Sequence, residues 1–295
     1  MSAPFEILLV TAPGLEAPLA EETRALGLTV TGTIPGGVTV TGGWPDVWRA
    51  NYALRGAARV LARIGSFRAF HLAQLDKRSR KFPWGEVLRP DVPVRIEVTT
   101  KASKIYHAKA AAQRVEKAIT EELCAPISSD AEIAIKLRID DNLCEFSVDT
   151  TGEALHKRGH KEAVGKAPMR ENLAAMFLRQ CGYQGTEPVV DPMCGSGTFM
   201  IEAAEIAAGL APGRSRGFAF EKLASIDAAT FAKIKAEPVK PLSTGLHFYG
   251  SDRDSGAIRM ARANAERAGV AEVIDFGLHG VSELKRPEGA PGIGR

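Results

Sequence analysis

The chain has 295 residues and a net charge of +3, with 45% hydrophobic and 25% charged residues, which is ordinary for a soluble globular protein of two domains or three small ones. No apolar run approaches the roughly 18 residues of a membrane-spanning helix, and the apolar patch at the N-terminus lacks the preceding basic residue of a signal peptide. The four cysteines stand singly, with no Cys-x-x-Cys pair and no histidine at metal-ligand spacing, so we expect no disulfide framework, no bound metal and a reducing, cytoplasmic location.

The first 66 residues have the pattern of a small ferredoxin-like unit. Its expected elements are a strand over 6–10, a helix over 15–26, two hairpin strands over 28–34 and 38–41 around a Pro-Gly-Gly turn, and a second helix. That second helix should begin after Asp46, a good N-cap residue, and continue to Ile64, because apolar residues recur on one helical face. The order β-α-β-β-α favours a ferredoxin-like unit.

Residues 67–151 are expected to form a second α+β unit. The stretch 67–92 is polar, basic and interrupted by prolines, so we expect a connector with little regular structure. Regular patterns resume with a strand over 93–100, a helix over 109–123, and a hairpin of 133–139 and 144–148 around an Asp-Asp-Asn turn.

The charge is distributed unevenly over this part of the chain. From Arg55 to Arg114 there are 14 Lys/Arg and 4 Asp/Glu, whereas 115–155 has 3 basic and 10 acidic residues. Clustered Lys and Arg attract polyanions, because their binding releases counterions from phosphates. The pattern therefore favours a basic surface for a polyanion, although two solvated faces of different charge would give the same counts.

From residue 152 onward, strands alternate with helices, which predicts a parallel sheet. The expected elements are a helix from Pro168 toward Gly182, a strand over 188–190, a helix over 199–206, an insertion over 209–245 with one short helix, a strand over 247–250, a helix over 255–268 and a strand over 273–276.

The stretch Asp191-Pro-Met-Cys-Gly-Ser-Gly-Thr198 joins a short apolar strand to a helix. An acid at a strand end, then Gly-x-Gly, then a helix suits a nucleoside cofactor, because glycines let the backbone approach a ligand and the first helical N–H groups are free. A P-loop is excluded, since Gly197 is not followed by Lys-Ser/Thr. A dinucleotide fingerprint fits poorly, because Met200 stands where Gly or Ala belongs and Asp252 follows Gly197 by 55 residues instead of about 20.

A methyltransferase site fits these residues better. Asp191 can meet a cationic amino group, the glycines can pack against the amino-acid part of a cofactor, and Asp252 can accept hydrogen bonds from two ribose hydroxyls. The candidate residues for binding S-adenosylmethionine are Asp191, Met193, Cys194, Gly195, Ser196, Gly197, Thr198, Asp252 and Arg253. Cys194 lies inside the loop, so we interpret it as a small packing residue and not as a nucleophile.

The same string, followed by Ile201-Glu-Ala-Ala204, resembles the class I RNA methyltransferases that carry a THUMP domain. The likeness extends to 149–160, 167–175 and 250–252, and it is strongest with the bacterial branch that methylates the N2 amine of a guanosine in 23S ribosomal RNA; relatives on this scaffold act on tRNA. The resemblance implies an α/β protein with a ferredoxin-like unit (1–66), a THUMP RNA-binding domain (67–151) and an incomplete Rossmann-like methyltransferase domain (152–295).

The resemblance also implies RNA as the partner. The candidate RNA-binding residues are Lys101, Lys104, His107 and Lys109, at the strand-to-helix junction of the expected THUMP domain, and Arg158. His156, Arg158 and His160 lie close together in the sequence, but neighbouring lysines make a poor setting for a cation. We therefore expect a structural or RNA-facing role for these three residues, and no metal or acid–base site.

In this family the fourth strand ends in an Asn-Pro-Pro-Tyr type motif, whose Asn side chain and Pro carbonyl would accept hydrogen bonds from the target amine. No such motif occurs in these residues, and the fourth strand should begin near 288–292. We therefore expect weak cofactor binding and no turnover, and the catalytic residues stay unassigned. Three functions remain open: an incompletely represented RNA methyltransferase, a non-catalytic RNA-binding protein and, with least support, a dinucleotide oxidoreductase.

Overall fold

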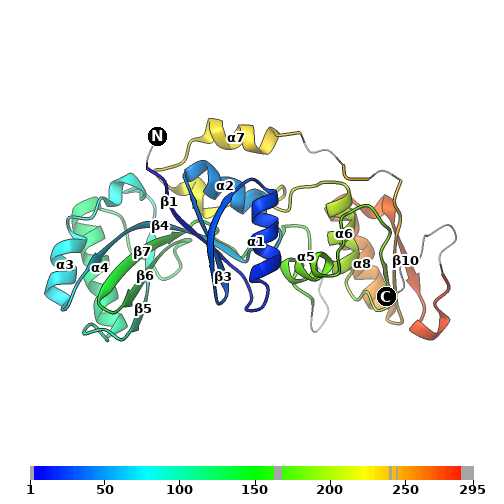
Figure 1. The fold of residues 1–295 in the computed structure, drawn as a ribbon, viewed down its shortest axis with the longest axis horizontal. Coiled ribbons are helices and arrows are strands. Elements are labelled where there is room, and N and C mark those ends of the chain that lie inside the picture. Colours follow the sequence, from blue (N-terminus) through cyan, green and yellow to red (C-terminus); the bar gives the residue numbers. More distant parts are fainter. Residues whose placement is uncertain (1–2, 163–167, 239–240, 244, 287–295) are drawn as a thin grey trace.

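The two halves of the chain each build a β-sheet, and they lie side by side along the longest axis of the molecule (Figure 1). The computed structural model describes residues 3–162, 168–238, 241–243 and 245–286. Over this described part, no helix is both long and apolar enough to cross a membrane. The expected start of a fourth strand, 288–292, lies outside the described residues.

The N-terminal sheet has seven strands in the order β2-β3-β1-β4-β7-β6-β5, and only the β5–β6 pair is parallel. The strands are β1 (Phe5–Val10), β2 (Thr29–Ile34), β3 (Gly37–Gly42), β4 (Arg59–Arg68), β5 (Val94–Lys101), β6 (Ile133–Asp140) and β7 (Leu143–Asp149). The helices of this half are α1 (Glu16–Ala25), α2 (Trp44–Ala53), α3 (Leu72–Ser79) and α4 (Ala108–Leu123). Both expected hairpins are confirmed, and the Asp141-Asn142 turn has positive φ at both residues.

The helix expected from Asp46 to Ile64 is wrong in its second half and at its start. The helix begins after Gly43, whose N–H donates to the Asp46 carboxylate (2.8 Å), and it ends at Ala53. The remainder is strand β4, because alternating Val60 and Ala62 point into the core while the strand pairs with β1 and β7. β4 crosses the boundary expected between 66 and 67, so the two expected units share one sheet.

The stretch 67–92 is also more regular than the sequence analysis predicted. It contains α3 and a short 3₁₀ turn over Trp84–Glu86, and its apolar residues reach the core between the basic ones: Leu75 and Trp84 are buried. The Trp84 ring lies 4.4 Å from the ring of Phe82 and 5.4 Å from that of Phe146 on β7, measured between centroids. These contacts explain why a basic, proline-interrupted segment is ordered here.

The C-terminal sheet has the order β10-β9-β8 and is parallel, as the alternation of strands and helices predicted. Its elements are α5 (Glu171–Gln180), β8 (Val190–Asp191), α6 (Thr198–Ala207), β9 (Phe248–Asp252), α8 (Ser255–Ala268) and β10 (Ile274–Leu278). The predicted bounds of α8 are confirmed, and the helix ends at Gly269 with φ of +74°, a left-handed position that favours glycine. The helix expected from Pro168 starts at Glu171.

The part of the expected insertion from Phe218 to Ile234 packs on the N-terminal half. Its short helix α7 (Ala228–Ala236) lies over α2 (Figure 1). The Phe231 ring lies 6.2 Å from that of Tyr52 on α2 and 4.9 Å from that of Phe220, which in turn lies 6.4 Å from Trp48. Aromatic residues of the insertion thus belong to the core of the N-terminal half.

Candidate functional site

The loop after β8 turns tightly into α6, and Gly197 makes the turn possible. Gly197 has φ of +84°, and a Cβ at this position would lie 3.1 Å from the Cβ of Ala261 on α8. Asn264, also on α8, donates from its side-chain amide to the carbonyl oxygen of Ser196 (3.1 Å). Packing against α8 therefore fixes the path of the loop.

A cavity of about 570 Å³, here called the loop cavity, lies beside this loop. Its lining comes from Pro168 and Met169, just before α5, and from residues between Val189 and Met200. At Gly195 a Cβ would meet no atom within 4 Å, so this stretch of backbone is open to a ligand. Such a space beside a glycine loop and a helix N-terminus can accommodate the polar end of a nucleoside cofactor.

Two carboxylates, those of Asp191 and Asp252, lie at the carboxyl ends of the neighbouring parallel strands β8 and β9. Asp191 accepts a hydrogen bond from the N–H of Met193 (2.9 Å). Asp252 accepts one from the N–H of Gly195 (3.1 Å) and one from the N–H of Asp254 (2.9 Å). Burial, and after it the negative charge of Asp252, raise the pKa of Asp191. The pair favours a ligand that brings a cation and hydroxyl groups.

The remaining candidate residues of the loop differ in their exposure. Ser196 and Thr198 are buried, whereas Met193 is 72% exposed, and Arg253 is exposed beyond the end of β9 and does not line the loop cavity. Cys194 is buried, and burial, followed by the charges of the two aspartates, raises the pKa of its thiol to about 12. The thiol is therefore protonated at neutral pH and is not an activated nucleophile.

The four candidate RNA contacts other than Arg158 lie in and beside the exposed loop between β5 and α4: Lys101 ends β5, Lys104 and His107 lie in the loop, and Lys109 is in the first turn of α4. Lys101, Lys104, His107 and Lys109 are all exposed there. The loop is anchored to the β6–β7 turn, since Asn142 accepts a hydrogen bond from the Lys104 N–H (2.9 Å) and donates its own N–H to the Ser103 hydroxyl (3.0 Å).

Two aromatic residues that the sequence analysis did not select complete this surface. Tyr106 is 70% exposed, and its ring lies 4.2 Å from that of His107. The ammonium of Lys104 lies 5.6 Å from the ring centre of Phe70, which is 42% exposed. An aromatic residue between two lysines, Tyr106 between Lys104 and Lys109, was the available signal in the sequence. Together these residues form what we call the basic–aromatic patch: Phe70, Lys101, Lys104, Tyr106, His107 and Lys109.

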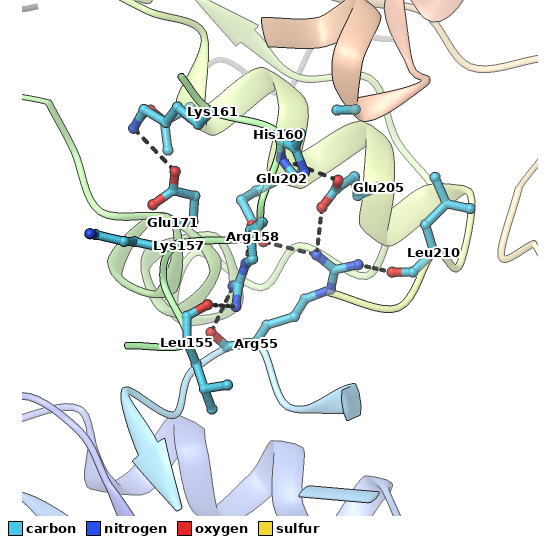
Figure 2. A network of polar contacts seen from close by, with 12 residues as sticks. Arg55, Leu155, Lys157, Arg158, His160, Lys161, Glu171, Glu202, Glu205 and Leu210 are labelled. Carbon is cyan, nitrogen blue, oxygen red and sulfur yellow. Dashed lines mark hydrogen bonds and ion pairs between the residues drawn. The ribbon is translucent and has the colours of Figure 1, made fainter. Parts of the chain in front are cut away.

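Arg158 was wrongly predicted as an RNA contact. Its side chain is 1% exposed, and its guanidinium donates to the Glu202 carboxylate (3.1 Å) and to the carbonyl oxygens of Leu155 (2.8 Å) and Arg55 (2.9 Å), as Figure 2 shows. A guanidinium enclosed in this way cannot reach a phosphate. The basic sequence around Arg158 could not reveal that its partner, Glu202, comes from a distant helix.

The two histidines beside Arg158 are shifted toward their neutral forms. Burial, followed by the charge of Arg170, lowers the pKa of His156 to about 4, and burial also lowers the pKa of His160. Both rings are therefore neutral near pH 7. Within the described residues, no three His, Cys, Asp or Glu side chains are grouped so that they could hold a metal ion.

Comparison with known proteins gives two family matches. Residues 158–293 match the model of the RMKL-like methyltransferase domain, and 6–61 match that of the RlmL ferredoxin-like domain. A ribosomal RNA large subunit methyltransferase K/L from Vibrio cholerae serotype O1 is 33% identical over 298 aligned residues, which cover 96% of this chain. The chain spans 42% of the length of that curated relative.

Solved structures agree with these matches along most of the chain. A possible methylase from Clostridium difficile 630 is 32% identical, with a TM-score of 0.85 over 96% of this chain and 77% of that one. The methyltransferase SMU.472, solved in complex with SAH, is 28% identical, with a TM-score of 0.85 over 97% of this chain and 78% of that one.

Replacing Asp191 with Asn should raise the free energy of unfolding at pH 7. A raised folded-state pKa means that the folded chain binds more protons than the unfolded one, so stability falls as the pH rises from the unfolded pKa of about 3.9 through the folded value. The amide avoids this loss and still accepts from Met193. Urea unfolding should show a gain at pH 7 that shrinks toward pH 4, with the exposed Asp275→Asn as control. Equal stability of D191N and the parent protein at pH 7 would contradict the prediction.

Proposed function

The chain belongs to the RMKL-like methyltransferase family, and from this we propose that it forms part of an S-adenosylmethionine-dependent RNA methyltransferase whose target is the N2 amine of a guanosine in 23S ribosomal RNA. The observation that carries the proposal is the open backbone at Gly195 between the carboxylates of Asp191 and Asp252. Support for ribosomal RNA comes from the Vibrio cholerae relative, which carries that substrate in its name.

The chain's own residues fit the cofactor's parts. Asp191 would receive the cationic amino group, and a bound cation there would offset the burial that raises its pKa. Asp252 would accept hydrogen bonds from the ribose hydroxyls through lone pairs that Gly195 and Asp254 leave free. When bound, the sulfonium cofactor supplies an electrophilic methyl group; the loop orients it, and Met193 lies at the exposed rim.

We further propose that residues 1–66 act as the ferredoxin-like unit, 67–151 as a THUMP domain and 152–295 as the methyltransferase domain. The matches at 6–61 and 158–293 support the outer two. In the middle part, the basic–aromatic patch would contact RNA. Lys101, Lys104 and Lys109 would neutralise phosphates. The outward-facing ring of Tyr106 would stack on an unpaired base, as aromatic residues in single-strand binding surfaces do.

Calorimetric titration of the chain with S-adenosylhomocysteine should give a saturable signal, and Asp252→Ala should weaken the affinity about 100-fold, because two hydrogen bonds to a charged acceptor are lost. Asp275→Ala, on the neighbouring strand β10, is the matched control and should bind like the parent chain. An affinity that D252A leaves intact would mean that the ribose does not lie at Asp252. A parent chain that binds no S-adenosylhomocysteine would contradict the proposed cofactor.

RNA affinity should depend on the basic–aromatic patch in two separable ways. Lys104→Ala should weaken binding to a single-stranded RNA and reduce the slope of log K against log salt by about 0.7, the value for one phosphate contact. Tyr106→Ala should weaken binding by about 1–3 kcal/mol with the slope unchanged, since stacking releases no counterions. Fluorescence anisotropy at several salt concentrations measures both, with Lys117→Ala, at an exposed ion pair farther along α4, as control. Binding by both patch variants that matches the control would exclude this surface.

The product of the whole gene should transfer labelled methyl groups from S-adenosylmethionine to 23S ribosomal RNA, and nucleoside mass spectrometry should identify the product as N2-methylguanosine. Incorporation into tRNA alone would show that the substrate is tRNA and not 23S ribosomal RNA. A different methylated nucleoside would replace the proposed acceptor atom, and no incorporation into either RNA would favour a non-catalytic RNA-binding protein.

A further inference from the structure

Two carboxylates of α6, those of Glu202 and Glu205, are completely buried where the two halves of the chain meet. Three guanidiniums from three different segments surround them, and Figure 2 shows two of these, Arg55 and Arg158. Arg55, after α2, lies 2.9 Å from Glu202 and 3.2 Å from Glu205; the other two pairs are Arg158 with Glu202 (3.1 Å) and Arg214 with Glu205 (2.6 Å). We call these five residues the buried ion network.

The buried ion network fixes α6 against the N-terminal half. Burial alone would raise the pKa of Glu202, but the charges of Arg158 and Arg55 outweigh burial and hold it below the usual value, so the carboxylate stays ionised. An ionised group without solvent is stable only while its partners stay within hydrogen-bond distance. Because α6 begins at Thr198, the same contacts also fix the end of the loop between β8 and α6.

Lys161 lies three residues beyond Arg158, in the segment between β7 and α5. Its side chain reaches two residues that line the loop cavity. Its ammonium donates to the carbonyl oxygen of Met169 (2.7 Å) and to the hydroxyl of Thr198 (2.9 Å), and it lies 3.4 Å from the Glu171 carboxylate. Only 8% of the Lys161 side chain is exposed. Met169 and Thr198 both line the loop cavity and come from different elements: one precedes α5, and the other starts α6. The Thr198 hydroxyl itself lies 3.5 Å from the Met169 carbonyl oxygen, so the ammonium of Lys161 adds to a direct contact between them.

We propose that Lys161 is a positioning residue that holds these two lining residues of the loop cavity together, so that the linking segment Arg158–Lys161 connects the buried ion network to the cofactor site. An ammonium has three donors, and here three acceptors from three positions surround it. The contacts themselves do not depend on any ligand. Only the consequence for cofactor affinity rests on the proposed function.

The neighbouring Lys157 provides a matched control. It directly precedes the linking segment, but its side chain is 59% exposed and pairs with Glu153 (2.5 Å). Among the described residues, Lys157 has no hydrogen bond or ion pair with those that line the loop cavity, whereas the side chain of Lys161 turns toward Glu171 (Figure 2). Removing the charge at position 157 therefore changes the net charge equally without touching Met169 or Thr198.

Amide hydrogen exchange of the ligand-free chain tests the contacts directly. In Lys161→Met, exchange over Gly195–Ile201, which includes the hydrogen-bonded N–H groups of Gly197 and Ile201, should accelerate about tenfold. Lys161→Arg should recover part of the protection, because it keeps the charge in a different geometry, and Lys157→Met should exchange like the parent chain. If K161M does not fold, Thr198→Val removes the hydroxyl that accepts from Lys161 and lies 3.5 Å from the Met169 carbonyl oxygen, and it should accelerate the same peptide to a smaller extent. Exchange in K161M, or in T198V in its place, that matches K157M would overturn the proposal.

Affinity for S-adenosylhomocysteine separates this proposal from the proposed function. When the parent chain binds, K161M should bind about tenfold more weakly and K161R should be intermediate, while RNA affinity stays unchanged. If the parent chain binds no S-adenosylhomocysteine but K161M exchanges faster, the cofactor assignment fails and the positioning role stands. If the parent chain binds it and K161M neither exchanges faster nor binds more weakly, the positioning role fails and the cofactor assignment stands.

Discussion

A charge in a protein interior needs a partner at hydrogen-bond distance, and this requirement determines how the two halves of the molecule meet. Glu202 and Glu205 have no access to water, so their stability depends on guanidiniums that arrive from the N-terminal half, the linking segment and the insertion. A displacement of either half by a few ångströms would leave a buried carboxylate uncompensated. Under the proposed function, the basic–aromatic patch and the loop cavity are therefore held at a set separation, and an RNA is selected partly by the distance between its anchored strand and its target base.

The candidate cofactor site departs from the same rule. Within the described residues, Asp191 and Asp252 accept hydrogen bonds from backbone N–H groups, and the charge of Asp252 helps to raise the pKa of Asp191. Such an arrangement does not favour the folded chain by itself. A cationic, hydroxyl-bearing ligand would balance the charges of the two carboxylates. Local departures of this kind are characteristic of binding sites.

The features that could be predicted from the sequence are those set by local chemistry. Helix α8 follows from its apolar spacing and its terminal Gly269, and the loop after β8 follows from its glycines. β4 could not be predicted because its apolar residues satisfy a helical and an alternating pattern at once, and pairing with β1 and β7 decides between them. The prediction that Arg158 contacts RNA was wrong for a related reason, since the burial of Arg158 depends on Glu202, which lies 44 positions away in the sequence. Tyr106 was visible in the sequence, but its exposure was not.

The aromatic contacts between the insertion and α2 also bear on how such a protein can be divided or recombined. Phe220 and Phe231 follow the loop between β8 and α6 in the sequence, yet they pack against Trp48 and Tyr52 in the N-terminal half. Dividing the chain near residue 151 would not give two parts with complete cores. The N-terminal part would lose the aromatic residues of the insertion, and the C-terminal part would expose them to solvent. An exchange of the first 150 residues between related chains would therefore have to carry the stretch from Phe218 to Ile234 with them, and the two parts should be inherited together.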